Sequence, residues 1–207
     1  MPIFVRIHKH FRILYTETNT LAALVCLVLC FFLTACGGRS VVELTYPLSP
    51  PAASDTRPNF CVVDFENMRT SHNLGTYRDG EVIRPRTPVE RWLASAVAGE
   101  LANKGFTAIT VENFKQALDV RADYIITGDA EEIRIDHPSI TRFASTLRMT
   151  LVLMDGRGRH VTANNYNGVF SQTVLPGTNV PRSLLSAALQ EVLQPAVRHI
   201  IQTVQSR

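Results

Sequence analysis

The chain has 207 residues, of which 45% are hydrophobic and 19% charged, a composition typical of a globular protein. Its formal net charge at pH 7 is +3. The first 35 residues hold three of the basic residues and one acidic residue, so the rest of the chain has 18 basic and 17 acidic residues and is nearly neutral. The absence of a concentrated basic field excludes nucleic acid as a partner.

Residues 1–35 have the features of a signal peptide. Arg6, Lys9 and Arg12 precede an uncharged apolar run at 21–35. This run is shorter than the roughly 20 residues that a membrane-spanning helix needs, so it fits the apolar region of a signal peptide. The run ends in the sequence LTAC, which resembles the cleavage site of bacterial lipoproteins. The sequence therefore predicts removal of residues 1–35 and acylation of the Cys36 thiol.

Acylation would make the membrane the first partner of the mature chain. One acyl chain holds a protein only marginally, whereas two or more give a stable anchor. In lipoproteins of enteric bacteria an Asp after the acylated cysteine is associated with retention in the inner membrane, and this chain has Gly37 instead. The predicted localisation is therefore the outer membrane, with the protein facing the periplasm and anchored through Cys36.

The remaining chain divides into a tether and a single domain. Residues 36–58 include the sequence PLSPPAAS and have little periodic apolar pattern, which favours an extended, semi-rigid linker. Residues 59–207 are of a suitable length for one domain with one hydrophobic core.

The domain begins with a strand and a small hairpin. Residues 60–65 form a short apolar and aromatic run that predicts a strand. Two strand-like runs, 74–78 and 81–83, flank the Asp79-Gly80 pair, and both residues of such a pair can adopt the positive φ of a tight turn.

The first helix has clear start and stop signals. Thr87, Pro88 and Glu90 stand in the order of an N-cap, a first helical residue and a capping box. Trp92 lies on the apolar stripe that follows, where a core anchor is the favoured interpretation, and Gly105 provides a C-terminal stop.

The second half of the domain is predicted to contain four strands, a helical turn and a final helix. The apolar pattern of 124–135 changes phase near Gly128, where a bulge is expected. A turn at 155–158 should join two strands of one long hairpin, and the final helix should bend rather than break at Pro195. The predicted elements are strands at 106–111, 124–135, 142–153 and 160–170, a helical turn at 113–118, and a helix after Pro181.

Two amphipathic helices and a mainly antiparallel sheet predict an α+β fold, a two-layer sandwich with both main helices on one face of the sheet. The opposite face of the sheet would then be polar and open to solvent. We expect this face to carry the candidate partner-binding residues Arg142, Thr146, Arg148 and Thr150. Arg148 beside hydroxyl groups could bind acidic or polar groups of another envelope protein, although a solvated polar surface is the more ordinary interpretation.

Three segments together resemble the YajG-type lipoproteins of Gram-negative bacteria. They are NMRT at 67–70, LGTYRD at 74–79, and the predicted first helix with Trp92-Leu93 and its Lys104-Gly105-Phe106 end. The similarity continues through the long hairpin and the final helix, and the longer charged N-terminal region departs from it. The resemblance implies an outer-membrane lipoprotein of unassigned biochemical role and supplies no catalytic residues.

No pattern in the sequence predicts catalysis, a cofactor or a metal site. His72, His137, His160 and His199 are scattered and lack metal-ligand spacing, and Cys61 lies in an apolar run, as a buried small hydrophobe would. Asp129, Glu131, Glu132 and Asp136 could be imagined as paired acids, but charge partners for Arg134 and Arg148 are the preferred interpretation.

The sequence therefore predicts a non-enzymatic protein that acts as a binding or assembly scaffold for other envelope proteins. The alternative is a transport accessory module that binds a lipid or an envelope fragment, which would need a deep apolar pocket. A hydrolase, which would need converging histidines and carboxylates, is the third and least favoured interpretation.

Overall fold

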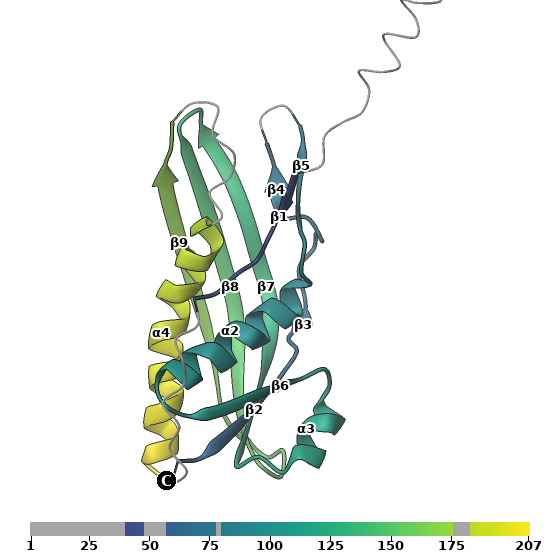
Figure 1. The fold of residues 1–207 in the computed structure, drawn as a ribbon, viewed down its shortest axis with the longest axis vertical. Helices are drawn as coiled ribbons and strands as arrows, with labels where there is room; N and C mark the ends of the chain where they lie inside the picture. The colour runs from purple at the N-terminus through teal and green to yellow at the C-terminus, as the bar shows by residue number, and fades with distance from the viewer. Residues whose placement is uncertain (1–39, 48–56, 78–79, 176–182) are drawn as a thin grey trace, which may run out of the picture. The chain divides into compact units, whose positions relative to one another are not determined.

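The computed structural model describes residues 40–47, 57–77, 80–175 and 183–207 (Figure 1). The predicted signal peptide, Cys36, the middle of the proline-rich segment, Asp79 and Pro181 lie outside the described residues. Nine strands and three helices within these ranges form an α+β fold.

Three long strands form the framework of the sheet. β7 (Tyr124–Ser139), β8 (Arg142–Asp155) and β9 (His160–Thr173) run antiparallel in chain order. Buried and less buried residues alternate along β8, as its sequence predicts for a strand with one face on the core. The long hairpin between β8 and β9 is thus confirmed.

On the other side of β7 the strands are short and mostly parallel to it. β2 (Asn59–Val63) pairs in parallel with both β7 and β6 (Thr107–Val111). β3 (Glu66–Asn67) and β4 (Gly75–Thr76) follow β2 along the same edge of β7 and also run parallel to it. The sheet is therefore mixed. Its parallel neighbours β2 and β6, and β2 and β7, are joined by long crossover connections that contain α2 (Val89–Asn103) or both α2 and α3 (Phe114–Val120).

The predicted small hairpin is present as β4 and β5 (Val82–Pro85), which pair antiparallel. β5 has a second partner that the sequence did not predict, because β1 (Ser40–Val42) adds in parallel to its free edge. Part of the segment predicted as a tether at 36–58 therefore belongs to the domain. Val42 and Leu44 are buried in the core, and the Trp92 side chain donates a hydrogen bond to the Thr45 carbonyl.

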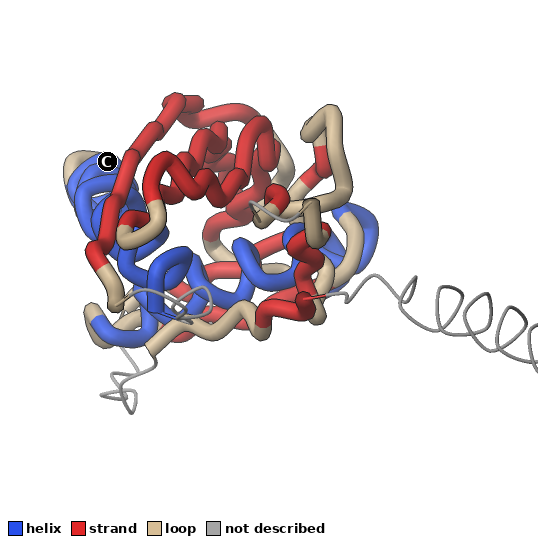
Figure 2. Tube along the Cα trace, turned by 90° about the horizontal axis from the view of Figure 1, so that it is seen from above, coloured by secondary structure: helices blue, strands red, loops and turns tan. Residues whose placement is uncertain are grey.

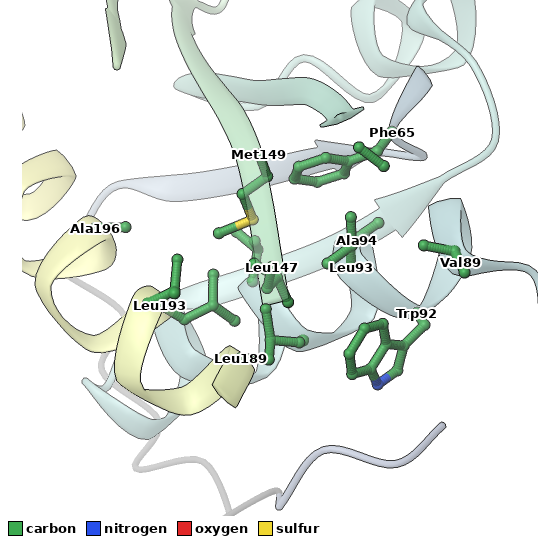
Figure 3. Close-up of a cluster of buried hydrophobic side chains, with 14 of the residues drawn as sticks. Phe65, Val89, Trp92, Leu93, Ala94, Leu147, Met149, Leu189, Leu193 and Ala196 are labelled. Atoms are coloured by element: carbon green, nitrogen blue, oxygen red, sulfur yellow. The ribbon is translucent and has the colours of Figure 1, made fainter. Parts of the chain in front are cut away.

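Two helices cover the inner face of the curled sheet (Figure 2). α2 (Val89–Asn103) and α4 (Ser183–Gln205) pack against it and against each other, and α4 continues through Pro195 without a break. The core lies between them and the long strands (Figure 3). Trp92, with 3% of its surface exposed, is part of this core as predicted. Side chains drawn in Figure 3 include Phe65, Leu93, Leu147, Met149, Leu189 and Leu193.

A third helix corrects the predicted two-layer arrangement. α3 (Phe114–Val120) packs against β2 and β6 and belongs to a second, smaller apolar cluster. Cys61 and Val63 of β2 face this cluster, whereas Phe60 and Val62 face the main core. Because successive residues of a strand point to opposite faces, α3 lies on the outer face of the sheet. Both faces of β2 are therefore covered, and the open outer face is confined to the longer strands.

Two local predictions need correction. Thr87 does not cap α2 by its side chain; the helix begins at Val89 after Pro88, and Glu90 instead accepts a hydrogen bond from Asn67. The register shift in β7 falls between Ala130 and Glu132, not at Gly128, and a second one precedes Ser139. Gly128 is instead a position with no room for a side chain, since a Cβ there would lie 2.0 Å from the Thr150 carbonyl oxygen.

Candidate functional site

A polar groove lies on the outer face of the sheet, where α3 no longer covers it. One wall is the segment from Arg69 to Tyr77, and the other is formed by residues 131–137 of β7 together with Arg148 of β8. Its volume is about 720 Å³. The segment reaches this position because β3 and β4 both pair with the same edge of β7, which holds the connection between them beside that strand.

Arg69 is held in this groove by a chain of polar contacts. Its Nε donates to Asn67 Oδ1 at 3.0 Å, and Asn67 Nδ2 donates to Glu90 Oε1 at 2.5 Å. The Nη1 atom of Arg69 is buried and has no hydrogen-bond partner among the described residues. Burial lowers the pKa of the Arg69 guanidinium below its usual value. A buried donor without a partner is rare because it loses its hydration without replacement, so the Arg69 guanidinium keeps one donor for which the described residues provide no acceptor.

Arg148, which the sequence predicts on a partner-binding face, forms the opposite side of the groove in an ion-pair network. It donates a hydrogen bond to Glu132 and lies 3.9 Å from Glu131. The hydrogen bond with Glu132 raises the pKa of Arg148. Arg134 pairs with Glu132 at 3.7 Å and with Asp136 at 3.0 Å. Glu131, Glu132 and Asp136 are therefore charge partners of the two arginines, as the sequence indicated, whereas Asp129 forms no ion pair with either of them.

The other predicted face residues divide into two locations. Thr146 and Arg148 line a smaller hollow of about 330 Å³ together with Asn167 and Val169 of β9. The Thr150 hydroxyl lies 2.6 Å from Glu131 Oε1 and 2.7 Å from Asn165 Oδ1. Thr146, Arg148 and Thr150 thus share one polar surface. Arg142 lies apart from them near the β7–β8 turn, where its guanidinium donates to Ser171 Oγ at 3.1 Å.

The sequence did not predict Arg69 as a site residue. It lies about eighty residues before Arg148, in a loop without periodic pattern, and only the pairing of β3 and β4 with β7 brings the two together. The one local signal is the polar run 66–73 directly after a buried strand. Residues that follow buried strands are common sites of binding.

His137 is the last residue of β7 that lines the groove, but it is not arranged for acid–base chemistry. Its ring stacks on Phe143 with centroids 4.2 Å apart, and the Tyr77 ring meets it edge-on. Both His137 ring nitrogens are buried without a hydrogen-bond partner among the described residues. A catalytic histidine is normally oriented by a second group through one ring nitrogen, and this geometry supplies no such contact.

The remaining candidates for chemistry are also accounted for by packing. Cys61 is free and buried, as predicted, and burial raises the pKa of its thiol, which disfavours the reactive thiolate. Burial, followed by the charges of Glu66 and Glu131, raises the pKa of Asp129. Within the described ranges, no three His, Cys, Asp or Glu side chains converge as metal ligands would. What the groove can do is bind a polar or charged group.

Comparison with known proteins adds the fold but no function. No family model matches the chain, and no curated protein matches it. The resemblance to the YajG-type lipoproteins therefore stays a prediction. Among the described helices, none has the length and apolar character needed to cross a bilayer.

Several solved structures are similar in fold. One is a protein of family DUF330 from Xanthomonas campestris, with 16% identity and a TM-score of 0.51 over 81% of this chain and 97% of that one. Another is a neuraminyllactose-binding hemagglutinin homolog from Helicobacter pylori, with 9% identity and a TM-score of 0.50 over 80% and 97% of the two chains. At such identities the likeness shows the α+β fold alone.

A lipoprotein from Neisseria meningitidis, GNA1162, is also among the structures found. It has 14% identity and a TM-score of 0.40 over 70% of this chain and 99% of that one. The TM-score is too low for an argument about this chain.

Proposed function

We propose that this protein is a non-enzymatic lipoprotein of the outer membrane that binds another envelope protein through the polar groove between Arg69 and Arg148. The observation that carries the proposal is the buried, unpaired Nη1 atom of Arg69 in a groove of about 720 Å³. A guanidinium held ready in this way favours a carboxylate or a backbone carbonyl of a partner, because charge-assisted hydrogen bonds are the strong ones.

The groove suits a partner protein better than a small apolar ligand. Arg69, Arg148, Glu132 and Asp136 all contribute to its walls, and small-molecule sites are mostly apolar with few polar groups. The inner face of the sheet is filled by the packed side chains of α2 and α4. Alternating charges along the groove match the electrostatic complementarity that gives protein interfaces their specificity.

The membrane anchor is the second part of the proposal and rests on the signal peptide and on Cys36. Cells that produce the Cys36→Ala variant are fractionated, and the protein should move from the membrane pellet to the soluble fraction. Density-gradient separation of inner and outer membranes then tests the localisation of the unaltered protein. Cleavage of the signal peptide is assayed in the same cells, and a processed Cys36→Ala protein that still pellets with membranes would disprove the lipid anchor.

The groove is tested by site-specific cross-linking in cells. A photoreactive amino acid replaces Ser71 in the groove or, as a control, Asp119 on the exposed side of α3. We expect a defined cross-linked product only from position 71. Adding Arg69→Met should abolish this product, because the substitution removes the donor and keeps most of the side-chain volume.

The matched control is Arg157→Met, which removes an exposed arginine from the β8–β9 turn. Thermal unfolding of both variants must agree with that of the unaltered protein before the products are compared. An unchanged product with a folded Arg69→Met variant, or the same product from position 119, would rule out the groove as the interface. Arg148→Glu is a poorer test, since it would leave Glu131 and Glu132 facing a third carboxylate.

A second candidate function, binding of an anionic lipid fragment, is favoured by one other hollow. It has a volume of about 570 Å³ and combines the cations Arg57, Lys104 and Arg198 with apolar Phe106 and Ile201. Arg57 lies over the Phe106 ring, 5.4 Å from its centre. Calorimetry with lysophosphatidylglycerol and lysophosphatidylcholine distinguishes the two functions: selective binding of the anionic lipid, lost in Arg198→Ala, would favour this one.

A further inference from the structure

The folded part of the chain begins very close to the residue predicted to carry the lipid. β1 starts at Ser40 and is fixed to the domain by its pairing with β5. The buried Val42 and Leu44 and the hydrogen bond from Tyr46 to Glu100, 2.9 Å long, secure the residues that follow. Only four Cα–Cα steps separate Cys36 from Ser40, so covalent geometry limits their separation to about 14 Å.

The strand register shows which end of the domain Ser40 faces. Ser40 pairs with Ile83, Ile83 pairs with Gly75, and Gly75 pairs with Ile135, so the four residues form one row across β1, β5, β4 and β7. β1 runs antiparallel to β7, which follows from the same pairings. The chain before Ser40 therefore enters the domain from the end at which β7 finishes.

The β7–β8 turn lies at the same end of the domain. Its distance from the row of Ser40 is similar to the distance that the chain between Ser40 and Cys36 can span. Ile140 lies five residues beyond Ile135, which at about 3.3 Å per residue places it about 16 Å above the row of Ser40. The register shift between Asp136 and Ser139 shortens this distance slightly. Since Cys36 lies at most about 14 Å from Ser40, a bilayer that holds its acyl chains reaches this turn when the long strands stand upright on it.

The turn carries a surface that suits a bilayer. Ile140 is 59% exposed and Leu175, at the end of β9, is 79% exposed. The backbone N–H of Val174 donates to the Thr141 carbonyl at 2.7 Å, which keeps the two apolar residues on the same tip. Arg142 adds an exposed cation, and neither 137–142 nor 171–175 contains an acidic residue.

We propose that this tip, defined as Ile140, Arg142 and Leu175, rests on the bilayer that holds the Cys36 anchor, with the apolar side chains among the lipid headgroups and Arg142 near anionic phosphates. The inference rests on the lipidation of Cys36 in the proposed function. Exposed apolar residues with a basic neighbour are the composition of surfaces that lie at the membrane interface. The end with α3 then points away from the membrane (Figure 1).

Fluorescence quenching in vesicles tests this orientation. The lipidated protein is purified with either Ile140→Cys or Lys115→Cys, labelled with an environment-sensitive fluorophore, and inserted into vesicles of phosphatidylethanolamine and phosphatidylglycerol. The only other described cysteine, Cys61, is buried. Lipids with a nitroxide near the headgroup should quench about half of the emission at position 140, because interfacial side chains enter roughly 5–10 Å into the bilayer. Position 115 on α3 should be unaffected.

A longer linker provides the matched variant. Ten Gly/Ser residues inserted after Gly38 should remove the length limit and reduce the quenching at position 140, while mass spectrometry confirms that the acyl chains are present. Equal quenching at positions 115 and 140, or no quenching at position 140 in a lipidated, vesicle-bound protein, would overturn the orientation and leave the anchor intact. A protein without acyl chains that does not bind vesicles would overturn both.

Discussion

Trp92→Ala should destabilise the domain by about 3–5 kcal/mol, the range for removing a large aromatic side chain from a packed core. Trp92 is 3% exposed and packs in the main cluster between α2 and the N-terminal segment. Its hydrogen bond to the Thr45 carbonyl is 3.3 Å long. Thr45 is exposed, so water can replace this bond and the loss of packing should dominate.

The measurement is urea unfolding of residues 39–207, which form one compact unit. With a slope of about 2 kcal/mol per molar urea, the midpoint should fall by about 1.5–2.5 M. Trp92→Phe keeps most of the apolar contact and should shift the midpoint by less than half as much. Protease cleavage within 40–46 should accelerate in Trp92→Ala. A midpoint that barely moves, or a segment 40–46 cleaved equally fast in both proteins, would refute this account of β1.

Three further perturbations follow from individual contacts. Gly128→Ala should destabilise the fold by about 3 kcal/mol in urea unfolding, since its Cβ would lie 2.0 Å from the Thr150 carbonyl oxygen. Gly80→Ala is the milder control: its Cβ would meet no described atom within 4 Å, and only the positive φ of 84° should cost about 1 kcal/mol. Asp155 accepts backbone hydrogen bonds from Arg159 and Arg157, which lower its pKa below 3.8. The stability that the ionised Asp155 contributes should be complete above the ordinary pKa of an Asp and should disappear as the pH falls through the lowered pKa. Asp155→Ala should therefore lower the melting temperature at pH 7 and hardly at pH 2. An equal loss at both pH values would contradict this. Arg148→Glu should lower the melting temperature, because it replaces the cation of two ion pairs with a third carboxylate beside Glu131 and Glu132. A folded variant with unchanged stability would show that the ion pairs contribute nothing.

The elements with strong local patterns were predictable from sequence. The alternation along 142–153 and the apolar stripe around Trp92 each identify one buried face, and the structure confirms both. The hairpin turn at 155–158 is equally local, because Asp155 accepts the backbone hydrogen bonds that close it. In these places the information lies within a few residues of the element itself.

The features that the sequence did not predict depend on distant pairing. β1 has a partner more than forty residues away, and the pattern of 40–46 alone is too short to mark it as a strand. The groove likewise forms only because β3 and β4 pair with β7. The helical turn predicted at 113–118 is confirmed as α3, but its seven residues have too few turns to show an amphipathic period, so its position over the outer face of β2 was not predicted.

The parallel pairing of β1 with β5 determines how the domain would respond to mechanical load. If a partner pulls the protein away from the membrane while the acyl chains hold, the force enters at Ser40 and acts along the axis of β1. The hydrogen bonds to β5 are then loaded together in shear, and Val42 and Leu44 must leave the core at the same time. Forced unfolding is governed by the unfolding rate, and such a concerted step is slower than the stepwise opening of a frayed end. A lipid on Cys36, as proposed above, would therefore transmit tension into the sheet without unravelling the domain from its N-terminal end.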